Sequence, residues 1–271
     1  MENQSALGII AGNGAYPFLV AKGARQSGVS AIHIAAFENE TRVELAGHAD
    51  SIEWMRVGQL GRLLKYFEKA GVRRVIMAGQ IAPKNLFDLR PDFRVLMVLS
   101  RLKRRNAETL FGALGDELAK IGIELLPAAT FLEDSLAGEG LIGGPKPKKR
   151  CLEDVAYGFE IAKEISKLDI GQTVIVRNGT VLAVEAFEGT NEAIRRGAAL
   201  GKHGAVVVKV SKPNQDIRYD VPVIGCETLE VASAAGVAVI AVEAGQTLLL
   251  DQEAVKALAD EKKVTIYGYK L

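Results

Sequence analysis

The chain has 271 residues, and its 34 Lys and Arg against 33 Asp and Glu give a formal net charge of +1 at pH 7. This even balance leaves no excess positive field to hold a polyanion, which excludes a general nucleic-acid-binding protein. Hydrophobic residues make up 48% and charged residues 25% of the chain, as in globular rather than disordered or fibrous proteins. The length favours two domains with separate cores.

Alternating short aliphatic runs and longer amphipathic stretches fill the first 130 residues, a pattern typical of repeated βα units. The predicted strands are 7–10, 31–35, 51–54, 74–77 and 124–126. The predicted helices are 16–27, 60–70, 93–104 and 107–120. Parallel strands joined by helices need cover on both faces of the sheet, so we expect a Rossmann-like domain over residues 1–130.

The periodicity disappears between Ala128 and Arg150, where repeated Gly and Pro residues break regular structure. We therefore predict a Gly/Pro-rich linker over residues 131–150 and a distinct α/β domain over residues 151–271. Its predicted helices are 153–168, 191–200, 227–235 and 252–260, the last capped by Asp251. Its predicted strands are 173–177, 181–186, 205–210, 237–242, 247–250 and 264–267. The substrate is expected between the two α/β domains.

Cysteine usage and the N-terminal sequence predict a cytoplasmic protein. Cys151 and Cys226 are the only cysteines and lack C-x-x-C spacing, which indicates neither a disulfide framework nor a structural zinc site. The polar start, Met1–Ser5, runs directly into a strand-like segment without the pattern of a secretion signal. The most apolar windows fall well short of the roughly 20 residues of a spanning helix, so any membrane contact is expected to be peripheral.

Two glycine loops follow predicted strands of the first domain: Gly12-Asn13-Gly14 and Gly79-Gln80. Because the carboxyl ends of parallel strands meet at one edge, we expect the loops to open together and to let backbone N–H groups approach a phosphate. Pro17 replaces the third glycine of the dinucleotide fingerprint, which disfavours an NAD-dependent oxidoreductase. An ordinary glycine-rich turn is an equally supported interpretation. Polar residues beyond the second loop, which are solvated loop residues in the simpler interpretation, are Lys84, Asn85 and Asp88.

In the second domain, Glu185 and Glu188 precede Thr190 at a predicted helix start. Carboxylates and free N–H groups in this arrangement can bind a cation and a phosphate side by side. The alternative is that Thr190 is only the N-cap of the helix.

A charged segment leaves the strand that ends near Lys209 and contains Gln215, Asp216, Arg218 and Asp220. Lys and Arg side chains can neutralise a pyrophosphate while Asp216 or Asp220 holds Mg²⁺ or deprotonates water, which is what phosphoanhydride cleavage requires. The alternative is that Asp220 is a turn carboxylate and that Lys212 is a solvated loop residue.

As a set, several motifs resemble the UDP-2,3-diacylglucosamine pyrophosphatase family of lipid A biosynthesis, the type unrelated to calcineurin-like phosphoesterases. The motifs are Gly8-Ile-Ile-Ala-Gly-Asn-Gly14, Pro17, Met77-Ala-Gly-Gln80, Gly143-Gly-Pro145, Glu185-Ala-Phe-Glu-Gly-Thr190 and Arg218-Tyr-Asp220-Val-Pro222-Val-Ile-Gly225. The resemblance spans nearly the whole chain.

The resemblance implies a Mg²⁺-dependent hydrolase that splits UDP-2,3-diacylglucosamine into UMP and 2,3-diacylglucosamine 1-phosphate. It implies that Asp220, in the family's R-[YF]-D-x-P motif, is the essential aspartate. In the mechanism that we expect, Lys209 or Arg218 offsets the charge that develops on the leaving phosphate. The substrate-binding residues that follow from the resemblance are Gly12, Asn13, Gly14, Gly79, Gln80, Thr190 and Gln215. The metal-binding residues that we expect are Asp220 together with Glu185 or Glu188. The family's G-D-D pattern is Gly115-Asp116-Glu117 here, which leaves a role for Asp116 open. A homodimer is also expected.

A substrate with two acyl chains demands an apolar surface. Apolar and basic residues lie near one another in one stretch of the sequence, which suggests contact with the inner-membrane surface. The apolar residues are Phe87, Leu89, Phe93, Leu96 and Met97, and the basic residues are Arg101, Lys103, Arg104 and Arg105. A core helix with a solvated side is the simpler interpretation. The alternative function is a non-catalytic nucleotide-sugar-binding module, because glycine loops bind phosphate whether or not chemistry follows.

Overall fold

The computed structural model describes residues 6–81, 91–103, 107–213 and 215–270. The chain forms two compact units, each built around its own sheet. Unit 1 consists of Met1–Leu132 and Asp216–Asp220, and unit 2 of Glu133–Gln215 and Val221–Leu271. Both are α/β, as the sequence predicts.

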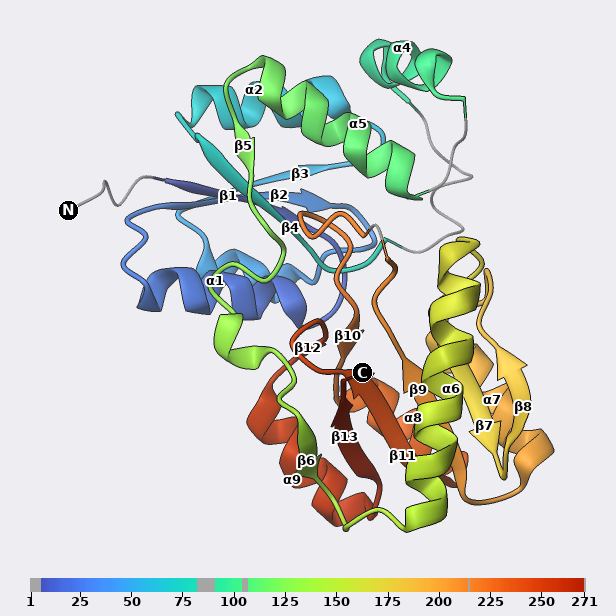
Figure 1. Cartoon of the computed structure of the whole chain (residues 1–271). Helices are drawn as coiled ribbons and strands as arrows, with labels where there is room; N and C mark the ends of the chain where they lie inside the picture. Colours follow the sequence, from blue (N-terminus) through green and yellow to red (C-terminus); the bar gives the residue numbers. More distant parts are fainter. Residues whose placement is uncertain (1–5, 82–90, 104–106, 214, 271) are drawn as a thin grey trace. The chain divides into compact units, whose positions relative to one another are not determined.

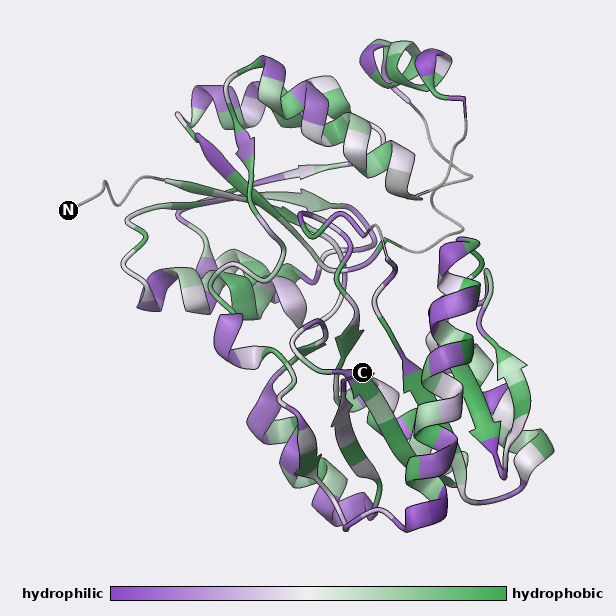
Figure 2. Ribbon diagram, viewed as in Figure 1, coloured by the Kyte–Doolittle hydropathy of each residue, from purple (hydrophilic) through white to green (hydrophobic). Residues whose placement is uncertain are grey.

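The sheet of unit 1 is parallel throughout and has the strand order β3-β2-β1-β4-β5. Its strands are β1 (Leu7–Ala11), β2 (Ile32–Phe37), β3 (Ser51–Met55), β4 (Arg74–Ala78) and β5 (Glu124–Leu125). This is the order of a Rossmann-like domain, so that prediction is confirmed. The central strands are aliphatic because both of their faces are buried, and Figure 2 shows them as hydrophobic.

Helices cover both faces of this sheet. They are α1 (Tyr16–Gln26), α2 (Leu60–Lys69), α4 (Phe93–Arg101) and α5 (Ala107–Lys120), with a 3-10 turn η1 (Val43–His48). Helix α1 lies on one face, and α2 and α5 lie on the other (Figure 1). Helix α2 buries Leu60, Leu63, Leu64 and Phe67, whose i, i+3, i+4, i+7 spacing forms one helical stripe.

The sheet of unit 2 is mixed, with the strand order β6-β13-β11-β9-β7-β8. Its strands are β6 (Gly140–Gly143), β7 (Thr173–Arg177), β8 (Thr180–Val184), β9 (Ala205–Lys209), β11 (Val237–Glu243) and β13 (Thr265–Tyr269), and β10 (Val223–Ile224) pairs separately with β12 (Leu248–Leu249). Its helices are α6 (Lys149–Lys167), α7 (Thr190–Gly201), α8 (Cys226–Ala234) and α9 (Gln252–Lys262), with a 3-10 turn η2 (Glu133–Ser135). Helix α6 packs on one face of the sheet, and α7, α8 and α9 pack on the other.

The segment predicted as a linker contains a strand of unit 2. Strand β6 pairs antiparallel with β13, and the turn that follows is fixed by bonds from Gly144 N to Asp260 Oδ1 at 2.9 Å and from Thr265 Oγ1 to Pro145 O at 2.7 Å. With four residues, two of them glycine, β6 is too short to show a period-2 pattern. Its order comes from the neighbouring strand and helix.

The charged segment after β9 also differs from expectation. The sequence places Asp220 in the domain over residues 151–271, whereas the structure places Asp216–Asp220 in unit 1. The amide of Ala128 donates to Ile217 O at 2.7 Å, and the Tyr219 ring packs against Phe111 with ring centroids 5.8 Å apart. The chain therefore leaves unit 2 after Gln215, completes part of unit 1 and returns.

Strands β7 and β8 pair antiparallel and form a hairpin. Asn178 and Gly179 occupy its turn with φ of +52° and +72°, the left-handed conformation that a tight hairpin needs. The buried carboxylate of Asp154, on α6, accepts hydrogen bonds from both turn amides, at 2.8 Å from Asn178 N and 2.7 Å from Gly179 N. One helix side chain thus holds the edge hairpin in register.

We predict that Asp154→Ala lowers the free energy of unfolding by about 1.5–3 kcal/mol, because two hydrogen bonds to a buried charged group are lost. Urea denaturation of the full chain measures this. The matched control is Glu160→Ala, at an exposed position on the same helix, with an expected change within about 0.5 kcal/mol. Equal effects of the two substitutions would contradict the assigned role of Asp154.

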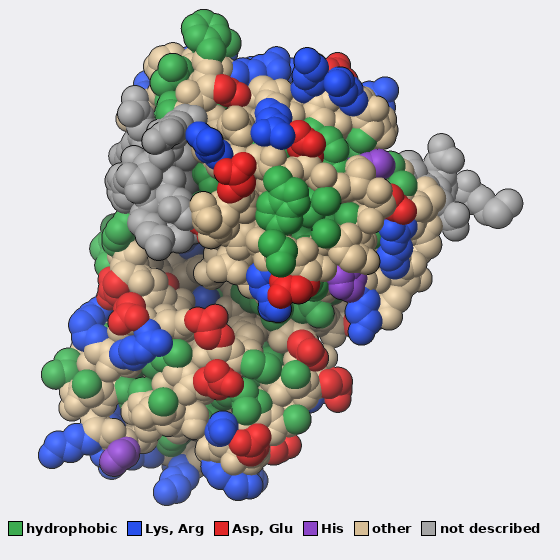
Figure 3. Space-filling model, turned by 180° about the vertical axis from the view of Figure 1, so that it is seen from behind, with side chains coloured by type: hydrophobic (Ala, Val, Ile, Leu, Met, Phe, Trp, Pro, Cys, Tyr) green, Lys and Arg blue, Asp and Glu red, His purple; other side chains and the backbone are tan. Residues whose placement is uncertain are grey.

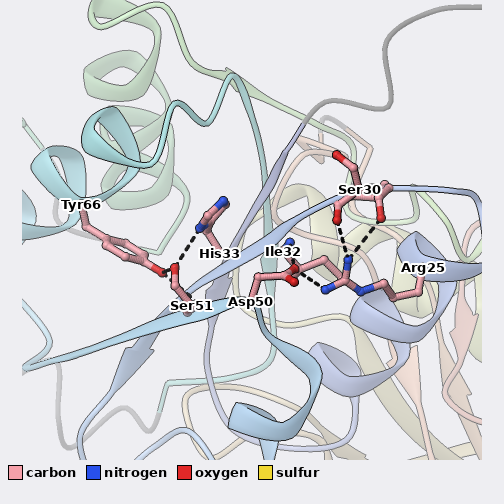
Figure 4. A network of polar contacts seen from close by, with 8 residues as sticks. Arg25, Ser30, Ile32, His33, Asp50, Ser51 and Tyr66 are labelled. Atoms are coloured by element: carbon pink, nitrogen blue, oxygen red, sulfur yellow. Dashed lines mark hydrogen bonds and ion pairs between the residues drawn. The ribbon is translucent and has the colours of Figure 1, made fainter.

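Two sets of polar contacts hold the amino ends of β2 and β3 together, one around Ser51 and the other around Asp50 (Figure 4). His33 Nδ1 lies 2.8 Å from Ser51 Oγ, which lies 2.7 Å from Tyr66 OH. Asp50 binds Arg25 and accepts from Ile32 N at 2.7 Å. Partial burial lowers the pKa of His33, and the smaller attraction of Asp50 opposes this shift. The imidazole therefore stays neutral to a lower pH in the folded chain than in the unfolded chain.

A lowered histidine pKa means that the unfolded state takes up the proton first as pH falls. We expect the stabilising effect of neutral His33 to be complete above its unfolded pKa of about 6.5 and to decline below it. The free energy of unfolding of the wild type should fall more steeply than that of His33→Gln between about pH 7.5 and 5.5. Denaturant titrations across this range measure both slopes, and parallel slopes would contradict the assignment.

Candidate functional site

The carboxyl ends of β1 and β4 form the point in unit 1 where the strand order reverses, which is where ligands bind in open α/β sheets. The two predicted glycine loops meet there through the backbone. Asn13 N donates to Gln80 O at 2.7 Å, and Gln80 N donates to Asn13 O at 3.2 Å. Gly12 N also donates to Ala78 O at 2.8 Å. The expectation that these loops lie together is confirmed. The expectation that their N–H groups approach a phosphate is not, because the amides of Gly12, Asn13, Gly14 and Gln80 donate to other protein atoms.

Two glycines make this close approach possible. A Cβ on Gly12 would overlap the carbonyl oxygen of Gln80, and one on Gly79 would lie 2.5 Å from Asn13 O. Gly79 also has a φ of +91°, which other residues adopt only with strain. Helix α1 begins directly after the first loop, with Pro17 in its first turn, so its N-terminal amides face the loop region where an anion is favoured.

We predict that Gly12→Ala lowers the free energy of unfolding by about 1–3 kcal/mol, since the added methyl group must push the two loops apart. The control is Gly47→Ala in η1, where an added Cβ meets nothing within 4 Å and the expected change is within about 0.5 kcal/mol. Urea denaturation of both variants checks this. Loss of stability in Gly47→Ala but not in Gly12→Ala would contradict the loop contact.

The segment Asp216–Asp220 gives unit 1 its charged candidate residues. Arg218 forms a two-point pair with Asp216, with Nε 2.9 Å from Oδ1 and Nη2 2.6 Å from Oδ2. This pair lowers the pKa of Asp216. The amide of Asp220 donates to Asp216 O at 3.0 Å, so the segment is a tight turn with a half-buried Asp220 at its end.

Asp116 contributes to the same charge balance. The hydrogen bonds that Arg218 donates to Asp216 raise the pKa of Arg218, desolvation opposes this shift, and Asp116 adds a smaller attraction. Gly115 of the same Gly115-Asp116-Glu117 motif lies beside the Arg218 guanidinium, since a Cβ on Gly115 would be 3.7 Å from Nη1. An electrostatic role toward Arg218 is the structural account of the motif whose role the sequence leaves open.

In unit 2, three predicted residues form one chain of hydrogen bonds at the carboxyl edge of the sheet. Lys209, buried at the end of β9, donates to Thr190 Oγ1 at 3.1 Å and to Val223 O at 3.2 Å. Thr190 in turn donates to Glu185 Oε1 at 2.9 Å. The interpretation of Thr190 as an N-cap is wrong: Gly189 occupies that position, and Thr190 is the first residue of α7.

Glu188 is held by a different partner. It pairs with Arg196, and this hydrogen bond lowers the pKa of the Glu188 carboxyl. Among the residues that the structure describes, no three His, Cys, Asp or Glu side chains lie together in a way that could hold a metal ion. The predicted ligands Glu185 and Glu188 lie in unit 2, and Asp220 lies in unit 1.

Three buried amide atoms near these residues have no hydrogen-bond partner among the described residues: Gln172 Oε1, Asn191 Oδ1 and Gln215 Nε2. Gln172 O accepts from Val210 N just beyond β9, and Asn191 follows Thr190 in α7. Leaving such an atom unpaired costs about 1–3 kcal/mol, which points to completion by a ligand or water. The sequence predicted Gln215. Gln172 and Asn191 were missed because isolated amides carry no pattern.

A second polar group missed from sequence lies at the same edge of the unit 2 sheet. Glu243 Oε2, at the end of β11, accepts from Ser211 N and Ser211 Oγ, each at 2.7 Å, and from Lys163 Nζ at 2.6 Å. This group fixes the start of the segment that leads to Asp220. The predicted Lys84, Asn85, Phe87, Asp88, Leu89, Arg104 and Arg105 lie outside the described residues.

Comparisons with known proteins cover almost the entire chain. The LpxI N-terminal domain model matches residues 6–135, and the LpxI C-terminal domain model matches residues 138–267. A curated relative, UDP-2,3-diacylglucosamine pyrophosphatase LpxI of Caulobacter vibrioides, is 34% identical over 275 residues, covering 97% of this chain and 96% of the relative.

Among solved structures, the chain is similar to the biotin carboxylase domain of Hydrogenobacter thermophilus 2-oxoglutarate carboxylase. That similarity has 14% identity and a TM-score of 0.28, and covers 65% of this chain and 35% of the other. A likeness at this level carries no argument about fold or function.

Proposed function

Because the chain belongs to the LpxI family, we propose that it hydrolyses the pyrophosphate of UDP-2,3-diacylglucosamine in lipid A biosynthesis. The products are UMP and 2,3-diacylglucosamine 1-phosphate. The observation that carries the proposal is the joined pair of glycine loops at the β1/β4 edge, in a chain that matches the family along its length. Family membership confirms the sequence resemblance.

The residues present fit a Mg²⁺ ion that is shared with the substrate. Mg²⁺ takes one or two protein carboxylates and fills its other positions with water and phosphate oxygens, so it does not need a cluster of three acidic residues. Asp220 stands in the Arg218-Tyr219-Asp220-Val221-Pro222 motif that resembles the family's, so Asp220 would be the carboxylate of this segment that holds the ion. Ligation by Glu185 or Glu188 would replace their bonds to Thr190 and Arg196. When bound, Mg²⁺ would neutralise pyrophosphate oxygens.

The other residues have roles that follow from their charge and hydrogen bonds. The loops Gly12-Asn13-Gly14 and Gly79-Gln80 would bind a phosphate or sugar oxygen near the start of α1, where the helix N-terminus favours an anion. The amides of Gly12, Asn13, Gly14 and Gln80 already donate to other protein atoms, so the helix end would supply the main attraction. Arg218 and Lys209 would offset the negative charge that develops as water adds to phosphorus and the P–O–P bridge breaks. Thr190 and Gln215 would bind the substrate through a hydroxyl and through a buried amide nitrogen.

The lipid nature of the proposed substrate bears on where in the cell the protein acts. A molecule with two acyl chains resides in a bilayer, so the protein is expected to meet its substrate from the cytoplasm at the inner-membrane surface. We further propose that it acts as a homodimer, as the family resemblance suggests.

We predict that Asp220→Asn lowers the rate of hydrolysis by at least about 100-fold while substrate affinity changes little, because the amide cannot replace a carboxylate toward Mg²⁺ or a proton. Phosphorus NMR follows UMP and sugar phosphate formation with and without Mg²⁺, and equilibrium binding is measured separately. The control is Asp134→Asn, at an exposed position in η2. Wild type that binds substrate but forms no product with any divalent metal would favour the non-catalytic binding module.

A further inference from the structure

Helix α4 has apolar side chains on two sides. Val95 and Val98 pack against the core of unit 1. On the other side, Phe93, Leu96 and Met97 are 76%, 52% and 39% exposed. Their i, i+3, i+4 spacing places them on one face of the helix. No other described helix exposes three large hydrophobic side chains, and Figure 3 shows hydrophobic side chains protruding over this part of the surface.

The start of α4 is firmly attached to unit 1. Asp92 caps the helix by accepting from Val95 N at 2.9 Å, and its second oxygen accepts from Gly61 N of α2 at 2.7 Å. Arg94 reaches Glu117 of α5 at 3.5 Å. The exposed apolar face is therefore presented by a helix whose opposite side is held by packing, a cap and an ion pair.

The charge of this stretch of sequence is one-sided. Residues 93–105 contain five cationic side chains and no acidic one, namely Arg94, Arg101, Lys103, Arg104 and Arg105. Since the whole chain carries +1, the remainder of the protein carries a net charge of −4. Arg101 and Lys103 are exposed. Although the protein as a whole is nearly neutral, a local concentration of cations attracts an anionic partner to this part of its surface.

We propose that the exposed face of α4, formed by Phe93, Leu96 and Met97 with Arg101 and Lys103, docks the protein onto an anionic lipid bilayer. The apolar side chains enter the boundary between head groups and acyl chains while the cations pair with lipid phosphates. Helix α4 has nine residues, and none of the described helices is long and apolar enough to cross a membrane, so the contact is interfacial.

A bilayer fits this face better than a second copy of the chain. A twofold contact through α4 would bring the exposed Arg101 and Lys103 of one copy close to those of the other, and that repulsion opposes self-association. The proposed lipid substrate adds a reason for docking, so the inference rests in part on the proposed function. Vesicle binding measured without substrate separates the two: docking can fail while hydrolysis of dispersed substrate persists.

The test is co-sedimentation of the full chain with vesicles of phosphatidylethanolamine and phosphatidylglycerol, compared with neutral phosphatidylcholine vesicles. Wild type should bind the anionic vesicles. The double substitution F93S/L96S should lower the partition coefficient by about tenfold or more, through lost apolar burial. R101Q/K103Q should lower it roughly fivefold per cation, and added salt should reduce wild-type binding.

Two matched controls test whether α4 is the docking element. L168S/L200S removes hydrophobic side chains that are 70% and 68% exposed elsewhere, and K148Q/K149Q removes two exposed cations of another basic run. Neither should change vesicle binding more than twofold. Thermal unfolding midpoints of all variants should match the wild type, because every altered side chain is exposed.

An inserted fluorophore gives a second, independent measurement. In L96W, added to a chain whose single tryptophan is Trp54, emission should shift to the blue on anionic vesicles and should be quenched by brominated lipid. Three results would overturn the proposal: no binding of wild type, equal losses in the control variants, or unchanged emission from L96W. Loss of substrate turnover in F93S/L96S with intact vesicle binding would assign the face to the substrate's acyl chains instead.

Discussion

The main-chain hydrogen bond from Ala128 to Ile217 is the constraint on which the location of Asp220 depends. With the Tyr219 ring on Phe111, it attaches a turn from the second half of the sequence to the core of unit 1. A single such bond contributes only about 1 kcal/mol. Burial of the Tyr219 ring must therefore also stabilise the attachment of the turn to unit 1. Both ends of the excursion are fixed in unit 2, at Ser211 by Glu243 and at Pro222, whose carbonyl accepts from Leu248 N at 2.9 Å.

This arrangement explains why the motif residues are so heavily hydrogen-bonded. Asp216 accepts from the Arg218 side chain and amide, and the Asp220 amide closes the turn on Asp216 O. In unit 1 the glycine loops are likewise joined backbone to backbone. Both features hold polar groups in place before any ligand arrives, which reduces the ordering that ligand binding must impose.

The amino-acid pattern predicted the fold well because both sheets are buried on two faces. Buried parallel strands must be aliphatic, and the runs near Leu7, Val75 and Val207 could therefore be found without tertiary information. Strand β6 could not be found, since its order comes from pairing with β13 and not from its own residues.

The candidate site was predictable where the residue type itself indicates a role in the structure, as at Gly12, Gly79 and Lys209. It was not predictable where main-chain atoms decide the geometry. The acceptor that holds the Asp220 segment is the main-chain carbonyl of Ile217, a group that every residue carries. Similarly, Gly189 and not Thr190 is the N-cap residue of α7. Gln172 and Asn191 became candidates only through their burial and unpaired oxygens.

Cleavage of a pyrophosphate by addition of water to phosphorus is the activity that we propose for this protein. The most direct measurement is mass spectrometry of the products formed from UDP-2,3-diacylglucosamine in ¹⁸O-labelled water. The account predicts UMP and 2,3-diacylglucosamine 1-phosphate, with one labelled oxygen on the phosphate that water attacks. Formation of UDP and free diacylglucosamine, or products without label in a phosphate, would contradict it.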